Sequence, residues 1–228
     1  MGKIFDYEGP VSVFLTRLVD LVWLNILFMI CCIPIVTFGA STTAMYYVTL
    51  KMAKNEEGYI TKSFFKSFKQ NFKQATAISL IFILVIIVLV FDFIIICGGS
   101  FDQMVRFNGV SRLVLIVAGI VGVIISVIQM YVFPLLARFD NTVINTIKNA
   151  FIIGIRHLPY TVLMILVSLV PLVLMYFSNS ALMLVIIQFS LVAYINSFFF
   201  NKIFVRYEPK DSASIDAEIK EADNQVVE

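Results

Sequence analysis

The chain has 228 residues, of which 60% are hydrophobic and 14% are charged, and its mean hydropathy is +0.95. A soluble globular domain has about 45–50% apolar and about 25% charged residues, so this composition excludes an ordinary soluble protein. The net charge of +2 is too small to indicate a nucleic-acid-binding protein, and we expect no nucleic-acid partner.

Five stretches are long and apolar enough to cross a lipid bilayer as helices. A hydrocarbon core about 30 Å thick requires about 20 apolar residues in a helix. The first stretch contains Asp20 and Asn25, the second contains Asp92, and the third and fourth contain no charged residue. We therefore predict an all-α, polytopic transmembrane helix bundle with about five spans. The predicted spans are about 18–38, 75–97, 113–137, 158–177 and 181–205.

Residues 1–206 are expected to form one transmembrane domain, and the acidic tail 207–228 is expected to be cytoplasmic and disordered. The amino-terminal apolar run is longer than the core of a signal peptide, and no small-x-small cleavage site follows it. We therefore expect the first span to be retained as part of the bundle.

The distribution of Lys and Arg predicts the orientation in the membrane. Segments 39–74 and 138–157, with the end of the last span, carry eleven basic residues, whereas the other loops carry Lys3, Arg17, Arg106 and Arg112. Positive charge is enriched on the cytoplasmic side of membrane proteins. The prediction is a multi-pass plasma-membrane protein with its amino terminus outside and its carboxyl terminus in the cytoplasm.

An amphipathic helix is predicted just before the second span. Its basic face consists of Lys62, Lys66, Lys69 and Lys73, at helical spacing. A second stripe at the same spacing is aromatic and consists of Phe64, Phe65, Phe68 and Phe72. The lysines form a candidate surface for anionic lipid headgroups or for an acidic partner. The other interpretation is an interfacial elbow whose lysines serve only as topology signals.

Two further segments are predicted to be short cytoplasmic helices. Segment 39–54 is helical in pattern, but its ~15 residues would cover only ~22 Å, too little to cross a bilayer comfortably. A re-entrant or interfacial helix fits it better, and its small residues would allow close packing on neighbouring helices. Segment 141–157 is a second amphipathic stretch, and it leads into the fourth span.

Four motifs and their order resemble those of a known family. They are PIVTFGASTTAMYYVTLK (34–51), KSFFKSFKQNFKQA (62–75), YVFPLLARFD (131–140) and IKNAF (147–151). Together they resemble the YesL-like family of small bacterial membrane proteins, whose function is unknown, over about residues 1–206. Members of that family are often encoded beside carbohydrate ABC importers, which implies a role in carbohydrate uptake. The family provides no catalytic or ligand-binding residues to carry over.

Polar side chains inside apolar spans are candidates for function, because burying them in a bilayer is costly. They are Asp20, Asn25, Asp92, Gln129, Gln188 and Asn196. The two aspartates are expected near the outer ends of their spans, in one layer, where water solvates them. The amides are expected to form interhelical hydrogen bonds rather than a solute path.

Arg138 and Asp140 end the third span on the predicted cytoplasmic side. They are expected to anchor the span or to pair with the lysine helix, in preference to recognising a solute.

Catalysis is not indicated. His157 is the only histidine, no phosphate-binding glycine loop or G-x-S-x-G motif is present, and we expect no metal or other cofactor. Two functional classes remain. The favoured one is a non-enzymatic accessory or scaffold protein bound to another membrane complex, such as a carbohydrate ABC importer. The alternative is a small-solute transporter or channel that acts as a homo-oligomer.

Overall fold

A computed structural model describes residues 10–56, 58–97, 109–177 and 185–208, and these residues form helices without any strand. The helices are α1 (Pro10–Cys31), η1 (Ile35–Thr37), α2 (Phe38–Met52), α3 (Ile60–Cys97), α4 (Gly109–Arg138), α5 (Val143–Arg156), α6 (Leu158–Phe177) and α8 (Gln188–Phe204). The all-α class predicted from the sequence is confirmed.

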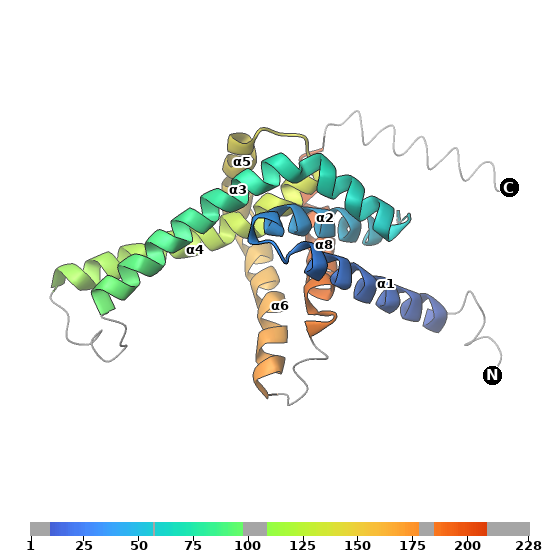
Figure 1. Ribbon diagram of the computed structural model, residues 1–228, viewed down its shortest axis with the longest axis horizontal. Helices are drawn as coiled ribbons and strands as arrows, with labels where there is room; N and C mark the ends of the chain where they lie inside the picture. The colour runs from blue at the N-terminus through green and yellow to red at the C-terminus, as the bar shows by residue number, and fades with distance from the viewer. Residues whose placement is uncertain (1–9, 57, 98–108, 178–184, 209–228) are drawn as a thin grey trace.

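Helix α2 lies at the centre of the fold, in contact with α1, α3, α4 and α8 (Figure 1). Eleven of its 15 residues are buried. Its first turns carry Gly39 followed by alanine, serine and threonine, so the neighbouring helix backbones can approach closely. At Gly39 a Cβ atom would lie only 2.5 Å from the carbonyl oxygen of Ala75 and would also overlap the Ser79 hydroxyl.

Two hydrophobic clusters meet at α2. One contains Tyr131 of α4 and Phe200 of α8, together with Ala40 and Leu50 of α2. The other contains Leu24 of α1 and Phe64 of α3, together with Ala44, Met45 and Val48 of α2. Tyr46 and Phe68 pack against both clusters. The small helix in the middle therefore joins all of the buried apolar surface into one core.

The lysine-bearing helix and the second predicted span form one uninterrupted helix. Helix α3 has 38 residues and contains neither glycine nor proline. At 1.5 Å per residue it is about 57 Å long, nearly twice the ~30 Å hydrocarbon thickness. The lysine-bearing segment is therefore not an interfacial helix that an elbow joins to a separate span.

Four of the described helices are long and apolar enough to cross a membrane: Val11–Cys31, Ile60–Ile94, Leu113–Arg138 and Leu158–Met175. The first lies several residues earlier than predicted, because Pro10 starts the helix and Pro34 prevents its extension. The fifth predicted stretch begins outside the described residues, and its described part is α8, of 17 residues.

Long apolar surfaces on α3, α4 and α6 have no protein cover. Leu84 is 64% exposed, Ile116 is 63% exposed and Leu166 is 55% exposed. Beyond the central core, α3 and α4 extend to one side and α6 extends in another direction (Figure 1). Apolar surface on this scale is stable only in contact with lipid or with another protein. The chain is therefore a membrane protein.

The start of α1 lies beside the turn that follows α2. The Arg17 guanidinium donates hydrogen bonds to the Met52 carbonyl oxygen and the Asn55 Oδ1, both at 2.8 Å. Groups that are hydrogen-bonded cannot face opposite sides of a core ~30 Å thick. The expectation that Arg17 and the lysine segment lie on opposite sides is therefore wrong. The short connection through η1 makes α1 and α2 antiparallel, which returns the chain to the same end.

Asp20 and Asp92 do not share a layer, contrary to the expectation. Asp20 lines the same cavity as Lys62, near the beginning of α3. Asp92 lies on α3 as well, 30 residues after Lys62. That separation corresponds to about 45 Å along the helix axis.

We predict that Gly39→Ala destabilises the protein by about 1–3 kcal/mol, because the added methyl group overlaps a backbone oxygen that cannot rotate away. Gly122→Ala in α4 is the matched control, since nothing lies within 4 Å of its added Cβ. The control should be neutral or up to about 1 kcal/mol more stable, from helix propensity. Thermal unfolding of both variants in detergent measures the difference. Equal unfolding temperatures would show that α2 is not packed as described.

Candidate functional site: a lysine-lined groove

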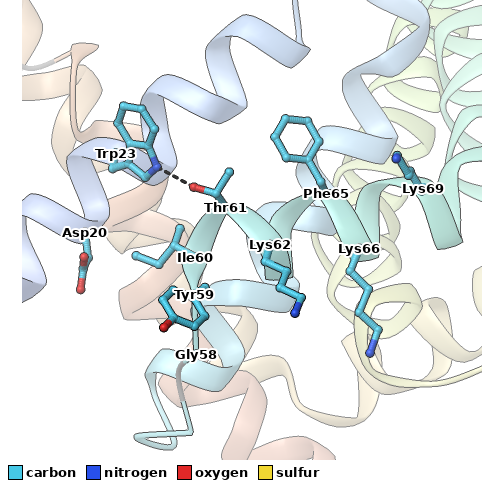
Figure 2. A pocket seen from close by; sticks show the side chains of 10 residues that line it. All are labelled: Asp20, Trp23, Gly58, Tyr59, Ile60, Thr61, Lys62, Phe65, Lys66 and Lys69. Carbon is cyan, nitrogen blue, oxygen red and sulfur yellow. Dashed lines mark hydrogen bonds between the residues drawn. The ribbon is translucent and has the colours of Figure 1, made fainter.

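A cavity of about 1020 Å³ opens between the middle of α1 and the beginning of α3. We call it the lysine groove, and Figure 2 shows its side chains. Helix α1 contributes Asp20 and Trp23. The turn before α3 and the first turns of α3 contribute Gly58, Tyr59, Ile60, Thr61, Lys62, Phe65, Lys66 and Lys69.

Helical spacing explains why three lysines line one wall. Residues three or four positions apart share a helix face, which places Lys62, Lys66 and Lys69 together. Another face of the same helix carries Phe64, which is fully buried against α1 and α2. Burial of that aromatic face fixes the rotation of α3 and directs the lysines away from the core. Lys73, the fourth predicted lysine, is exposed but lies beyond the groove.

Trp23 closes one end of the lysine groove. Its Nε1 donates a hydrogen bond of 2.9 Å to the Thr61 hydroxyl, so α1 is attached to the first turn of α3 (Figure 2). The indole nevertheless remains 48% exposed, and Tyr59 is 85% exposed. Exposed aromatic side chains with a polar tip are common anchors at protein and membrane interfaces. Neither aromatic residue was selected from the sequence, because its exposure depends on the contact between α1 and α3.

The charge of the lysine groove is positive. No ion pair between described residues involves Lys62, Lys66 or Lys69. The one carboxylate in the lining is that of Asp20 on α1. Three ammonium groups on one helix face repel one another, and an incoming anion would relieve that repulsion. The arrangement is suited to binding a negatively charged group.

Arg138 forms an ion pair at the end of α4, although not with the lysine helix. Its Nε and one terminal nitrogen donate to the Glu208 Oε1 at 2.9 and 2.6 Å, and Lys54 lies 3.8 Å from the same oxygen. Glu208 belongs to the tail predicted to be disordered, yet it is placed firmly against two basic residues. Asp140 is exposed and lines a separate cavity beside Tyr207. Arg138 therefore pairs with Glu208 and not with the lysine helix.

The chain is similar to a family of known proteins and to one bacterial protein. Residues 21–93 match the family described as "Protein of unknown function, DUF624". The chain is also 28% identical over 206 residues to "Uncharacterized protein YesL" of Bacillus subtilis (strain 168), covering 85% of this chain and 94% of that protein. The chain is thus similar to the DUF624 family in its first half and to YesL over most of its length. No solved structure matches it.

The matched DUF624 region contains α2, the second half of α1 and nearly all of α3. It therefore includes most of the lysine groove, from Trp23 to Lys69, and the central helix that holds the groove together. The resemblance to the YesL-like family predicted from the sequence motifs is confirmed.

The remaining polar positions of this YesL-like chain lie apart from the groove. Asn25 is buried between α1 and α8, where its Nδ2 donates to the Val185 carbonyl oxygen at 3.0 Å and its Oδ1 accepts from the Ser190 amide at 3.1 Å. This is the interhelical hydrogen bonding expected of it. Gln129 lines a neutral cavity between α2, α4, α6 and α8, and Asp92 is half-buried near the end of α3.

His157, between α5 and α6, is buried next to Tyr207, with 3.2 Å between its Nε2 and the tyrosine hydroxyl. Burial lowers the pKa of the imidazole below its ordinary value, and the nearby positive charges of Arg206 and Arg156 lower it further. The folded protein therefore binds a proton at His157 less readily than the unfolded chain does.

We predict that acidification destabilises the protein through His157. A depressed folded-state pKa contributes stability that is complete above the unfolded value of about 6.5 and is lost as the pH falls through the lower, folded-state pKa. The thermal unfolding midpoint should fall more steeply between pH 7.5 and pH 5 in the wild type than in His157→Gln. The Gln side chain can still bond to Tyr207 but does not titrate. Identical pH profiles would exclude His157 as the cause.

Proposed function

We propose that this protein is a non-enzymatic accessory or scaffold protein of the cell membrane, whose lysine groove binds an acidic segment of a partner protein. The observation that carries the proposal is the groove itself. Three lysines without carboxylate partners among the described residues line a large open hollow next to two exposed aromatic side chains. Buried aromatic anchors surrounded by complementary charge are the usual source of affinity and specificity in protein interfaces.

Two features favour an acidic protein segment over lipid headgroups as the occupant. The lysine groove is an open hollow between two helices, whereas a layer of headgroups presents a broad and nearly flat surface. Its wall also includes Asp20, whose carboxylate repels headgroups of uniform negative charge. A peptide can place acidic side chains against the lysines and an uncharged or basic side chain near Asp20. A groove that carries both positive and negative charge favours partners with the complementary pattern of charges over other partners.

The proposed orientation places the lysine groove, the start of α1 and the end of α8 in the cytoplasm. Arg17 bonds to Asn55, and the neighbouring Lys54 contacts Glu208, so these three segments gather at one end of the core. Lys3 and Arg17 then join the eleven basic residues of the predicted cytoplasmic side, which leaves Arg106 and Arg112 for the other side. This orientation satisfies the positive-inside rule better than the one first predicted from the sequence.

The partner we propose is a component of a carbohydrate ABC importer. This part of the proposal comes from the resemblance to the YesL-like family and not from any contact in the fold. The groove indicates the chemistry of the contact, and the resemblance to the family indicates the class of membrane complex.

The single tryptophan of the chain, Trp23, lies in the groove and provides a direct test. In nanodiscs of neutral lipid, titration with hexaglutamate should shift the Trp23 fluorescence emission. Replacing Lys62, Lys66 and Lys69 with Gln should weaken the apparent affinity by about 100-fold, at ~1 kcal/mol for each lysine, and less at high salt.

The matched control removes the same charge outside the groove, through Lys73→Gln, Lys148→Gln and Lys202→Gln. This variant should bind hexaglutamate nearly as the wild type does. Equal weakening in both triple variants would show that net charge, rather than the groove, attracts the peptide. If nanodiscs with anionic lipid produce the full emission shift and abolish hexaglutamate binding, the groove is a headgroup site and the partner proposal is wrong.

The orientation is tested by labelling single cysteines with a membrane-impermeant maleimide. The three positions are Val13→Cys on α1, Tyr59→Cys in the groove and Ser100→Cys between α3 and α4. The natural cysteines Cys31, Cys32 and Cys97 are replaced with alanine. Intact cells should label only Ser100→Cys, and permeabilised cells should label all three. Labelling of Val13→Cys without Tyr59→Cys in intact cells would place the two segments on opposite sides.

A further inference from the structure

A further cavity, of about 340 Å³, lies between α2, α4, α6 and α8, and we call it the neutral cavity. Its lining contains no charged side chain. The polar residues that line it are Thr42, Tyr46, Ser126, Gln129, Ser168 and Asn196. An adjoining cavity of about 310 Å³ shares Thr42, Tyr46 and Ser168 with it and also includes Gln188. Two of the helices that enclose the neutral cavity, α4 and α6, are candidate membrane spans.

Three of the four hydroxyl groups in the neutral cavity, all but that of Tyr46, are available only as acceptors. Thr42 donates to the Phe38 carbonyl oxygen, Ser126 to that of Gly122, and Ser168 to that of Met164, each at 2.8 Å. A hydroxyl has one proton to donate and two lone pairs. With each proton bound to the helix backbone, the three oxygens can receive hydrogen bonds but cannot give them.

Asn196 adds a buried acceptor without a donor. The side chain is 1% exposed, and its Nδ2 donates to the Ser168 Oγ at 3.4 Å. This amide orientation follows from the chemistry, since the Ser168 proton already points to Met164 and its oxygen needs a donor. The Asn196 side chain also interacts with the Tyr46 hydroxyl, but its Oδ1 accepts no hydrogen bond among the described residues. The Oε1 of Gln188, in the adjoining cavity, is likewise buried without a donor.

We propose that the neutral cavity is a binding site for a small, uncharged solute that carries several hydrogen-bond donors. Buried acceptors destabilise a protein unless donors reach them, and this cavity presents several acceptors facing one space. A charged ligand would require a counter-charge that the lining does not contain. The volume is within the usual range of small-molecule sites, about 300–1,000 Å³. The rings of Tyr46 and Phe133 provide apolar walls for the carbon skeleton of the solute.

This site is independent of the lysine groove. The two cavities have no lining residue in common, and one is charged whereas the other is neutral. The neutral cavity can therefore bind a solute whether or not the groove binds a partner.

Saturation-transfer NMR in detergent micelles tests the proposal with erythritol as the probe. Erythritol carries four hydroxyl donors, and its tetramethyl ether has the same skeleton without any donor. Transfer of magnetisation from the wild-type protein should be clear for erythritol and absent for the ether. Equal transfer to both would mean that apolar contact alone drives binding, and no transfer to erythritol would mean that the cavity holds water only. Either result overturns the proposal.

The variant Asn196→Leu keeps the size of the side chain and removes the unpartnered acceptor. It should reduce the erythritol signal by about fivefold or more, the effect of losing one hydrogen-bonded pair. Asn145→Leu on the exposed side of α5 is the matched control and should leave the signal unchanged. Ser168→Ala makes a smaller change in the same cavity and decides the question if Asn196→Leu does not fold. An unchanged signal in a folded Asn196→Leu or Ser168→Ala protein would locate erythritol elsewhere.

Discussion

Helix α2 can occupy the centre of the fold only because its first turns carry almost no side-chain volume. Gly39 sits against the backbone of α3, and the alanines, the serine and the threonines after it are buried between four helices. Small residues allow backbones to approach closely. Van der Waals contact between backbones then takes the place of the contacts that larger apolar side chains make in a soluble core. Both hydrophobic clusters include residues of α2. The positions of α1, α3, α4 and α8 therefore all depend on this one helix.

Central packing of α2 also determines where charge gathers. The turn after α2 carries Lys54 and Asn55, which contact Glu208 at the end of the described chain and Arg17 on α1, respectively. Arg138, at the end of α4, shares Glu208. The lysine groove opens next to this cluster, while the apolar lengths of α3, α4 and α6 lead away from it (Figure 1). The molecule is thereby divided into a polar end and apolar arms, as expected of a protein with one end in water and its arms in lipid.

Two cavities of opposite chemistry result from this division. The lysine groove is open, basic and lined by exposed aromatic residues, which suits an acidic partner that approaches from water. The neutral cavity lies between helices and presents oxygen acceptors whose own protons are bound to the backbone. Serine and threonine can adopt this arrangement on helices because their hydroxyl groups reach the carbonyl oxygen four residues earlier. A partner-binding role and a solute-binding role are therefore compatible within one small membrane protein.

The sequence by itself determined the helical class, the membrane setting and the lysine face of α3, because each follows from composition or from a helical period. The resemblance to the YesL-like family followed from four motifs and their order. The sequence also indicated that segment 39–54 is a short helix packed on its neighbours. The tertiary structure alone decided which ends meet. Arg17 was assigned to the side opposite the lysine segment, and Glu208 was assigned to a disordered tail, because loop charges report topology only on average. Asp20 joined the lysines, and Trp23 and Tyr59 became groove residues, through contact between α1 and α3. Such contacts depend on how closely α2 lets its neighbours approach, and a periodic pattern along one helix contains no information about that distance.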